Sequence, residues 1–266
     1  MQTVISKDGT KIAFDKVGSG PAIILVNGAM SYRAFDPTLG ELAELLGTDF
    51  TVYNYDRRGR GESGDIQSIT KQREIDDVQA LIGDAGGEAM LFGISSGGAI
   101  ALETAAVTPS VTKVAVYEVP FIVDDSREPL KDYESYTTKL VAENKIDELV
   151  EYFLRKVAGI PAEYLVGIKQ DQGMWNKMLA IAPTIPYDAA FMSEFMKGKP
   201  PSADYWAKVT VPVLVTVGGA SPAWFPHAAD ALAKVLPDAR QQTLEGQTHQ
   251  VDAKVLAPVL SHFFKK

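Results

Sequence analysis

Residues 90–106 read MLFGISSGGAIALETAA and carry the clearest structural signal in the chain. A short apolar run is followed by two serines between glycines, and then by a helical pattern. Residues 93–97 fit the pattern G-x-S-x-G, in which a serine occupies a sharp turn from a strand to a helix and needs small neighbours. The start of the helix also places backbone N–H groups beside that serine. The pattern predicts Ser95 as a nucleophile, whereas Ser96 does not fit because Ile94 stands where glycine is required.

Short apolar runs alternate with helical patterns on both sides of this turn. Continuous apolar runs suit strands that are buried on both faces, as in a parallel sheet. The runs predict strands at 3–6, 12–17, 22–26, 50–55, 90–92, 112–117, 211–217 and 240–244. The helical patterns predict helices at 35–46, 69–85, 96–106, 227–236 and 256–264.

Residues 121–206 show helical patterns and no convincing strand. Alternation that stops for a helical stretch and then resumes predicts an α/β fold with a mostly parallel, twisted sheet, flanking helices and an inserted α-helical cap. We expect residues 1–120 and 207–266 to form the core and residues 121–206 to form the cap.

Composition disfavours several kinds of site and partner. The 266 residues include 26 Lys and Arg against 34 Asp and Glu, a net charge of −8, which disfavours binding to nucleic acid or to an anionic membrane. There is no Cys, so thiolate chemistry is absent, and the presence of only three His disfavours a multi-histidine metal site. We expect no metal, no cofactor, a small-molecule substrate, and a monomer or a homodimer.

The first residues, MQTVISKDGTKIAF, lack the basic stretch and the apolar run of about 7–15 residues that mark a signal peptide. The sequence also lacks a run of about 18 apolar residues of the kind that spans a membrane. These two patterns favour a cytoplasmic protein.

Four features together resemble the α/β-hydrolase superfamily. They are Ser95 in its turn, Asn27-Gly28 after an apolar run, Asp56-Arg57-Arg58-Gly59-Arg60-Gly61-Glu62-Ser63, and Gly246-Gln247-Thr248-His249. The resemblance covers the chain outside the predicted cap and implies a Ser–His–acid triad, an oxyanion hole and a lid. We interpret the Arg- and Gly-rich segment at 56–63 as a structural, hydrogen-bonded loop, because the phosphate-binding pattern G-x-x-x-x-G-K-[ST] is absent.

His249 follows a predicted strand and precedes the last predicted helix, where this superfamily keeps its catalytic histidine. A base has to come within about 2.6–3.2 Å of the serine hydroxyl, which a loop at this edge of the sheet allows. His262, in the terminal helix, and His227, after Pro226, are weaker candidates.

The acid departs from the commonest family pattern. Most members carry an Asp just after the strand predicted at 211–217, but Ser221 stands there. Some members, among them a group of haloalkane dehalogenases, carry a Glu at the end of the preceding strand, and this chain has Glu118 at that place. The resemblance therefore implies Glu118 as the triad acid. Asp124 and Asp125 are the next candidates, and a triad that uses a water or Ser221 is the remaining alternative.

The family usually has His-Gly where this chain has Asn27-Gly28. The resemblance implies an oxyanion hole made by the backbone N–H groups of Ala29 and Ser96, which do not depend on side-chain identity. The predicted cap holds 12 of the 24 aromatic residues and includes methionines at helical spacing, which favours an apolar substrate. The pocket is predicted to include Asn27, Met30, Trp175, Met178 and Trp224.

The resemblance implies a serine hydrolase that cleaves a small, fairly apolar carboxylic ester, lactone or thioester through an acyl-enzyme. A carbon–carbon bond hydrolase, a lyase or a cofactor-free perhydrolase on the same triad is the alternative chemistry. A dehalogenase or an epoxide hydrolase is disfavoured, because those relatives use a carboxylate nucleophile where Ser95 stands. A catalytically silent binding module or receptor of the same fold is the alternative from another class.

Overall fold

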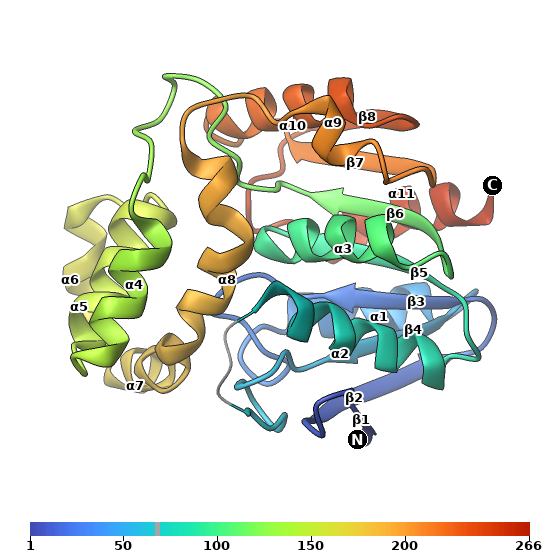
Figure 1. The fold of residues 1–266 in the computed structure, drawn as a ribbon, viewed down its shortest axis with the longest axis horizontal. Coiled ribbons are helices and arrows are strands. Elements are labelled where there is room, and N and C mark those ends of the chain that lie inside the picture. Colours follow the sequence, from blue (N-terminus) through green and yellow to red (C-terminus); the bar gives the residue numbers. More distant parts are fainter. Residues whose placement is uncertain (67–69) are drawn as a thin grey trace.

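The central sheet has eight strands in the order β1-β2-β4-β3-β5-β6-β7-β8 (Figure 1). The protein is described here by a computed structural model that covers residues 1–66 and 70–266. The pairs β1–β2 and β2–β4 are antiparallel, and every pair from β4 to β8 is parallel. The strands are β1 (Gln2–Ile5), β2 (Lys11–Gly18), β3 (Ala22–Val26), β4 (Thr51–Tyr55), β5 (Ala89–Ile94), β6 (Val111–Tyr117), β7 (Val213–Gly218) and β8 (Ala239–Leu244).

Helices cover both faces of the sheet, because the central strands are apolar on both sides. On one face, α1 (Thr38–Leu46) packs against α11 (Ala253–Lys265). The other face is covered by α2 (Lys71–Asp84), α3 (Ser96–Val107) and α10 (Trp224–Val235). The predicted parallel sheet with flanking helices is therefore confirmed. In the parts of the chain that the structure describes, no helix combines the length and the apolar character needed to cross a membrane.

The chain between β6 and β7 is helical, as the sequence predicts. Its elements are α4 (Tyr133–Ala142), α5 (Ile146–Tyr152), the π-helix η1 (Phe153–Val157), α6 (Ala162–Gln170), α7 (Gln172–Ile181), the 3-10 helix η2 (Ala182–Thr184), α8 (Ile185–Met192), the 3-10 helix η3 (Ser193–Met196) and α9 (Ala203–Trp206). In Figure 1, α8 runs between the sheet and the group α4–α7. It contacts α2 and α3 on the core side and α4 on the cap side. The limits of the cap at residues 121 and 206 stay a prediction.

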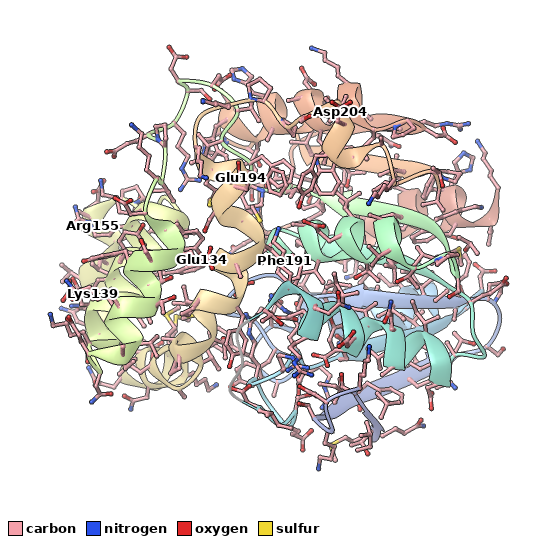
Figure 2. All side chains as sticks on the ribbon, viewed as in Figure 1. Glu134, Lys139, Arg155, Phe191, Glu194 and Asp204 are labelled. Carbon is pink, nitrogen blue, oxygen red and sulfur yellow. The ribbon has the colours of Figure 1, made fainter. Side chains whose placement is uncertain are left out.

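The two sides of the inserted helices differ in polarity (Figure 2). Phe191, on α8, is fully buried, and its apolar cluster continues into the core beside α3. Glu134, Lys139 and Arg155, on α4 and η1, are exposed. Apolar burial therefore fastens the inserted helices to the sheet through α8.

Several boundaries differ from those predicted. The helix predicted at 227–236 begins at Trp224, because Pro226 lies in its first turn, where a missing N–H group is tolerated. The helix predicted at 35–46 begins at Thr38, whose amide donates to the carboxylate of Asp36. The helix predicted at 69–85 is described from Lys71, and residue 69 lies outside the described residues.

Candidate active site

Ser95 occupies the turn between β5 and α3, with φ 56° and ψ −130°. A residue other than glycine is strained at positive φ, so the surrounding structure has to hold its backbone in this conformation. A Cβ atom on Gly93 would lie 2.4 Å from the carbonyl oxygen of Gly97, and one on Gly97 would lie 2.1 Å from that of Val26. Glycine is therefore required on both sides of the serine, which is the packing that the G-x-S-x-G pattern predicts.

Backbone strain is concentrated around this turn. Among the residues that the structure describes, four other than glycine have positive φ: Met30, Ser95, Glu118 and Asn144. Three of these four were singled out from the sequence as site residues. Strained backbone conformations cluster at functional sites, where the fold holds side chains in special directions.

Glu118 directly follows β6 and is buried. Its Oε2 atom lies 2.8 Å from Nδ1 of His249, while its Oε1 atom accepts hydrogen bonds from the Gly218 amide, at 2.8 Å, and from the Ser221 hydroxyl. Ser221 occupies the position predicted for the family's usual Asp. Its hydroxyl therefore donates to the Glu118 carboxylate, which comes from the end of β6. Both carboxylate oxygens have donors, as a buried charge requires.

The other two carboxylate candidates have different contacts. Asp124 pairs with Nδ1 of His227 at 2.7 Å and accepts hydrogen bonds from Ser126. Asp125 is exposed, and the described contacts give it no bond to either histidine. The structure brings only Glu118, of the three, into contact with His249.

Two hydrogen bonds to its backbone carbonyls hold the loop that carries His249. The Tyr117 hydroxyl donates to the Thr248 carbonyl at 2.6 Å, and the Ala220 amide donates to the Gln247 carbonyl at 2.9 Å. The imidazole also stacks on Phe225, with ring centroids 4.9 Å apart. Because the carboxylate accepts from Nδ1, the other ring nitrogen, Nε2, is left for proton transfer.

Ser95 and His249 are both partly exposed, and the described contacts include no hydrogen bond between them. Such a bond is often long in a free enzyme and tightens when substrate binds. A cavity of 580 Å³ opens near Arg33, Asp56 and Ile181, and none of the three predicted triad residues lines it.

The loop after β3 lies against Ser95. A Cβ atom on Gly28 would be only 3.0 Å from that of Ser95. The amide of Ala29 donates to no protein acceptor in the described residues, and the amide of Ser96, at the start of α3, is one that a helix leaves unpaired. Both amides are therefore free to meet an oxyanion at Ser95.

The predicted pocket residues fall into two groups. Asn27 is buried, and its side-chain oxygen accepts a hydrogen bond from Ser31, so it orders the loop that contains Met30, which is also buried. Trp224 stacks on Phe225, the ring that lies on His249.

The other two pocket candidates, on α7, have contacts within the cap. The Trp175 indole donates to Asp147 at 3.1 Å, and Met178 packs against the main apolar cluster. No described contact links either side chain to Ser95 or His249, and their role in the pocket stays a prediction.

The sequence analysis missed one buried residue at the site, Asp188 on α8. Its carboxylate accepts hydrogen bonds from the Ser96 hydroxyl at 2.7 Å, from Arg57 at 2.5 Å and from Arg60. Arg57 also pairs with Glu74. A buried guanidinium needs a carboxylate partner, so an Asp inside the apolar run of residues 185–192 was the available signal.

Comparisons with known proteins agree with this architecture. The model of the alpha/beta hydrolase family matches residues 23–260. An alpha/beta hydrolase from Sphaerobacter thermophilus is 45% identical, covers 99% of this chain and 100% of its own, and has a TM-score of 0.88.

Two more distant structures share the fold. The enol-lactonase from Burkholderia xenovorans is 19% identical over 100% of both chains, with a TM-score of 0.74. A thermophilic esterase from Thermogutta terrifontis is 20% identical over 99% of this chain and 97% of its own, with a TM-score of 0.70. No curated protein matches the sequence. With its match over residues 23–260, the chain belongs to the alpha/beta hydrolase family.

Proposed function

We propose that the protein is a serine hydrolase that cleaves small, fairly apolar carboxylic esters, lactones or thioesters through an acyl-enzyme. The hydrogen bond between the buried Glu118 carboxylate and Nδ1 of His249 carries the proposal. This pair and Ser95 lie at the carboxyl ends of parallel strands, where open α/β sheets bind ligands.

In the first half of the proposed reaction, the Ser95 oxygen attacks the ester carbonyl while Nε2 of His249 takes the hydroxyl proton. The carbonyl oxygen becomes an oxyanion that the amides of Ala29 and Ser96 bind. When the carbon–oxygen bond to the alcohol breaks, His249 gives its proton to the departing alkoxide. The acyl group is then an ester of Ser95.

In the second half, His249 takes a proton from a water that attacks the acyl-enzyme. The Ser95 oxygen leaves and regains its proton from His249, so a carboxylic acid is released and the enzyme is restored. Glu118 holds the imidazole in one tautomer and stabilises its positive charge in both halves.

The surroundings of His249 support an apolar substrate. Phe225 and Trp224 form a stack beside the imidazole, and Met30 is buried in the loop next to Ser95. Apolar walls with few polar groups are typical of sites for small molecules. The esterase and the enol-lactonase with the same fold make ester and lactone substrates the first to assay.

The test compares wild type, Ser95→Ala and Ser135→Ala, an exposed serine on α4, on 4-nitrophenyl esters, lactones and thioesters. Ser95→Ala should lower kcat by about 10⁴-fold or more with little change in Tm, because it removes the nucleophile but little packing. Ser135→Ala should match wild type.

Labelling by a fluorophosphonate, followed by mass spectrometry, should find the adduct on Ser95 and on no other serine. Turnover that survives in Ser95→Ala would overturn the proposal. A labelled Ser95 without turnover on any ester, lactone or thioester would contradict the substrate class and favour the carbon–carbon bond or binding alternatives.

A further inference from the structure

The carbonyl oxygen of Gly28 accepts hydrogen bonds from two buried guanidinium groups. Nη1 of Arg60 lies 2.7 Å from it, and Nη1 of Arg57 lies 3.4 Å from it. Both arginine side chains are fully buried. This carbonyl belongs to the same peptide unit as the amide of Ala29.

A peptide unit is planar and trans, so its C=O and N–H bonds point in opposite directions. Holding the Gly28 carbonyl on a guanidinium therefore fixes the direction of the Ala29 amide. A positively charged donor on the carbonyl also polarises the peptide and strengthens its N–H group as a donor. This peptide packs against Ser95, where the proposed oxyanion forms.

Arg60 is itself held by α8 and by the last residue of η2. Its Nη2 atom donates to Asp188 and its Nε atom to the Thr184 hydroxyl at 3.0 Å. Asp188 also accepts a hydrogen bond from the Ser96 hydroxyl, with the two oxygen atoms 2.7 Å apart. One carboxylate thus fixes both segments that carry the free amides, Ala29 through Arg60 and Ser96 through its side chain.

The charges in this cluster balance. Burial by itself would raise the pKa of Asp188, but Arg57 and Arg60 hold that pKa below its usual value, so the carboxylate stays ionised. Glu74 is the second carboxylate, and it accepts two hydrogen bonds from Arg57. With its pairs complete, the cluster holds a fixed geometry in the interior.

We infer that Arg60 and Asp188 are positioning residues of the oxyanion hole: Arg60 orients the Gly28–Ala29 peptide, and Asp188 holds Arg60 and the Ser96 hydroxyl in place. The ligand of this arrangement is the oxyanion of an acyl-transfer intermediate. The inference rests on the proposed function, because that function assigns the Ala29 and Ser96 amides to the oxyanion.

The test uses Arg60→Gln and a matched control, Arg58→Gln. Arg58 lies in the same loop and is equally buried, but it pairs with Asp77 at 2.7 Å and Asp8 at 3.0 Å and has no described contact with Gly28. Both substitutions remove a buried guanidinium. Arg60→Gln should lower kcat by about 10²–10³-fold, the effect of losing one oxyanion donor, with KM within about twofold. Arg58→Gln should keep kcat within about threefold, because the oxyanion peptide is not touched.

Fluorophosphonate titration counts the folded, active sites in each variant, so loss of folded protein does not enter kcat. Arg60→Lys keeps a cation within reach of the carbonyl and should recover kcat to within about tenfold of wild type. It also keeps the inference testable if Arg60→Gln does not fold.

Two further readouts separate positioning from general structural damage. The affinity for a trifluoromethyl ketone, which forms an oxyanion on Ser95, should fall by the same factor as kcat/KM in Arg60→Gln. The carbonyl stretch of the acyl-enzyme should move to higher frequency, because its hydrogen bonds are weaker.

Unchanged kcat and ketone affinity in the Arg60 variants would overturn the inference, and so would equal losses in Arg60→Gln and Arg58→Gln. Failure of the proposed function is distinguishable, because in that case either Ser95→Ala retains turnover or the wild type itself turns over no ester, lactone or thioester. If Ser95→Ala is inactive while the Arg60 variants are normal, only the positioning role is wrong.

Discussion

Glu118 and Asp188 are both buried carboxylates at the site, but their partners differ. Glu118 meets an imidazole, a backbone amide and a hydroxyl. Asp188 meets two guanidinium groups and a hydroxyl. One lies after a strand of the core, and the other lies on a helix of the insertion.

The comparison teaches that the partner decides what a buried carboxylate can do. The guanidinium groups beside Asp188 are always charged, so its interaction energy does not change during a reaction. The imidazole beside Glu118 gains a charge only when it takes a proton, so that interaction becomes strongest at the moment of proton transfer. Glu118 is suited to catalysis and Asp188 to holding structure.

Among substitutions of the two carboxylates and their partners, Glu118→Gln should have the largest effect on the catalytic rate. The substitution keeps the size of the side chain but removes the charge that stabilises the imidazolium, so kcat should fall by about 10²–10⁴-fold with little change in KM. Steady-state kinetics with a 4-nitrophenyl ester measure the loss. Asp124→Asn and Asp125→Asn are the controls and should each change kcat by less than about tenfold. A nearly normal Glu118→Gln beside an inactive Asp variant would move the acid to the loop.

Asp188→Asn should lower the stability of the protein more than Glu118→Gln does. It leaves two guanidinium groups with too little negative charge, so the free energy of unfolding should fall by about 3–5 kcal/mol. Glu118→Gln, whose partners are neutral when His249 is unprotonated, should lose less than about 2 kcal/mol. Urea unfolding of both variants gives the comparison, and equal losses would remove the distinction drawn between the two carboxylates.

Low pH should destabilise the protein by protonating carboxylates that pair with arginine. Burial alone would raise the pKa of Asp8, but its bonds with Arg58 and Thr10 lower that pKa well below the usual value of 3.8. A lowered pKa gives stability that is complete above the unfolded value and is lost as the pH falls through the folded value. The free energy of unfolding of the wild type should therefore decline below about pH 4, and the decline should be smaller in Asp8→Asn. Parallel curves for the two proteins would show that Asp8 contributes nothing to acid stability.

Ser221→Ala should have a smaller effect on kcat than Glu118→Gln. It removes one of the three donors to the Glu118 carboxylate and leaves the bond to His249, so kcat should fall by about threefold to tenfold. Wild-type kinetics in this variant would mean that the Gly218 amide and His249 suffice. A loss as large as that of Glu118→Gln would mean that Ser221 sets the direction of the carboxylate.

Much of the core was predictable because its signals are local. The strand, the turn and the helix around Ser95 lie within twenty residues. Gly93 and Gly97 are required there because a Cβ atom at either position would clash with the backbone, and this requirement is visible in a single sequence. Glu118 was predicted as the acid because the usual Asp position holds Ser221, and the resemblance offered one other place for a carboxylate at the end of a strand. The structure brings this residue into contact with His249.

Asp188 was not predictable in the same way. It lies 92 positions after its partner Ser96 and 131 after Arg57, and it meets both only when α8 packs on the core. The helix boundaries in the insertion also depend on packing, as the π-helix η1 between α5 and the following turn illustrates. Periodicity predicts that helices form there but not which residue faces which partner.

The pairing of Asp188 also has a consequence for motion. If α8 moved away from the sheet, it would carry the Asp188 carboxylate out of the interior. Arg60 would then lose its carboxylate partner and Arg57 one of its two, which costs several kcal/mol. Opening movements on the microsecond-to-millisecond scale have to avoid that penalty. During substrate exchange, α8 should therefore stay packed on the sheet, while the helices beyond it, from α4 to α7, move.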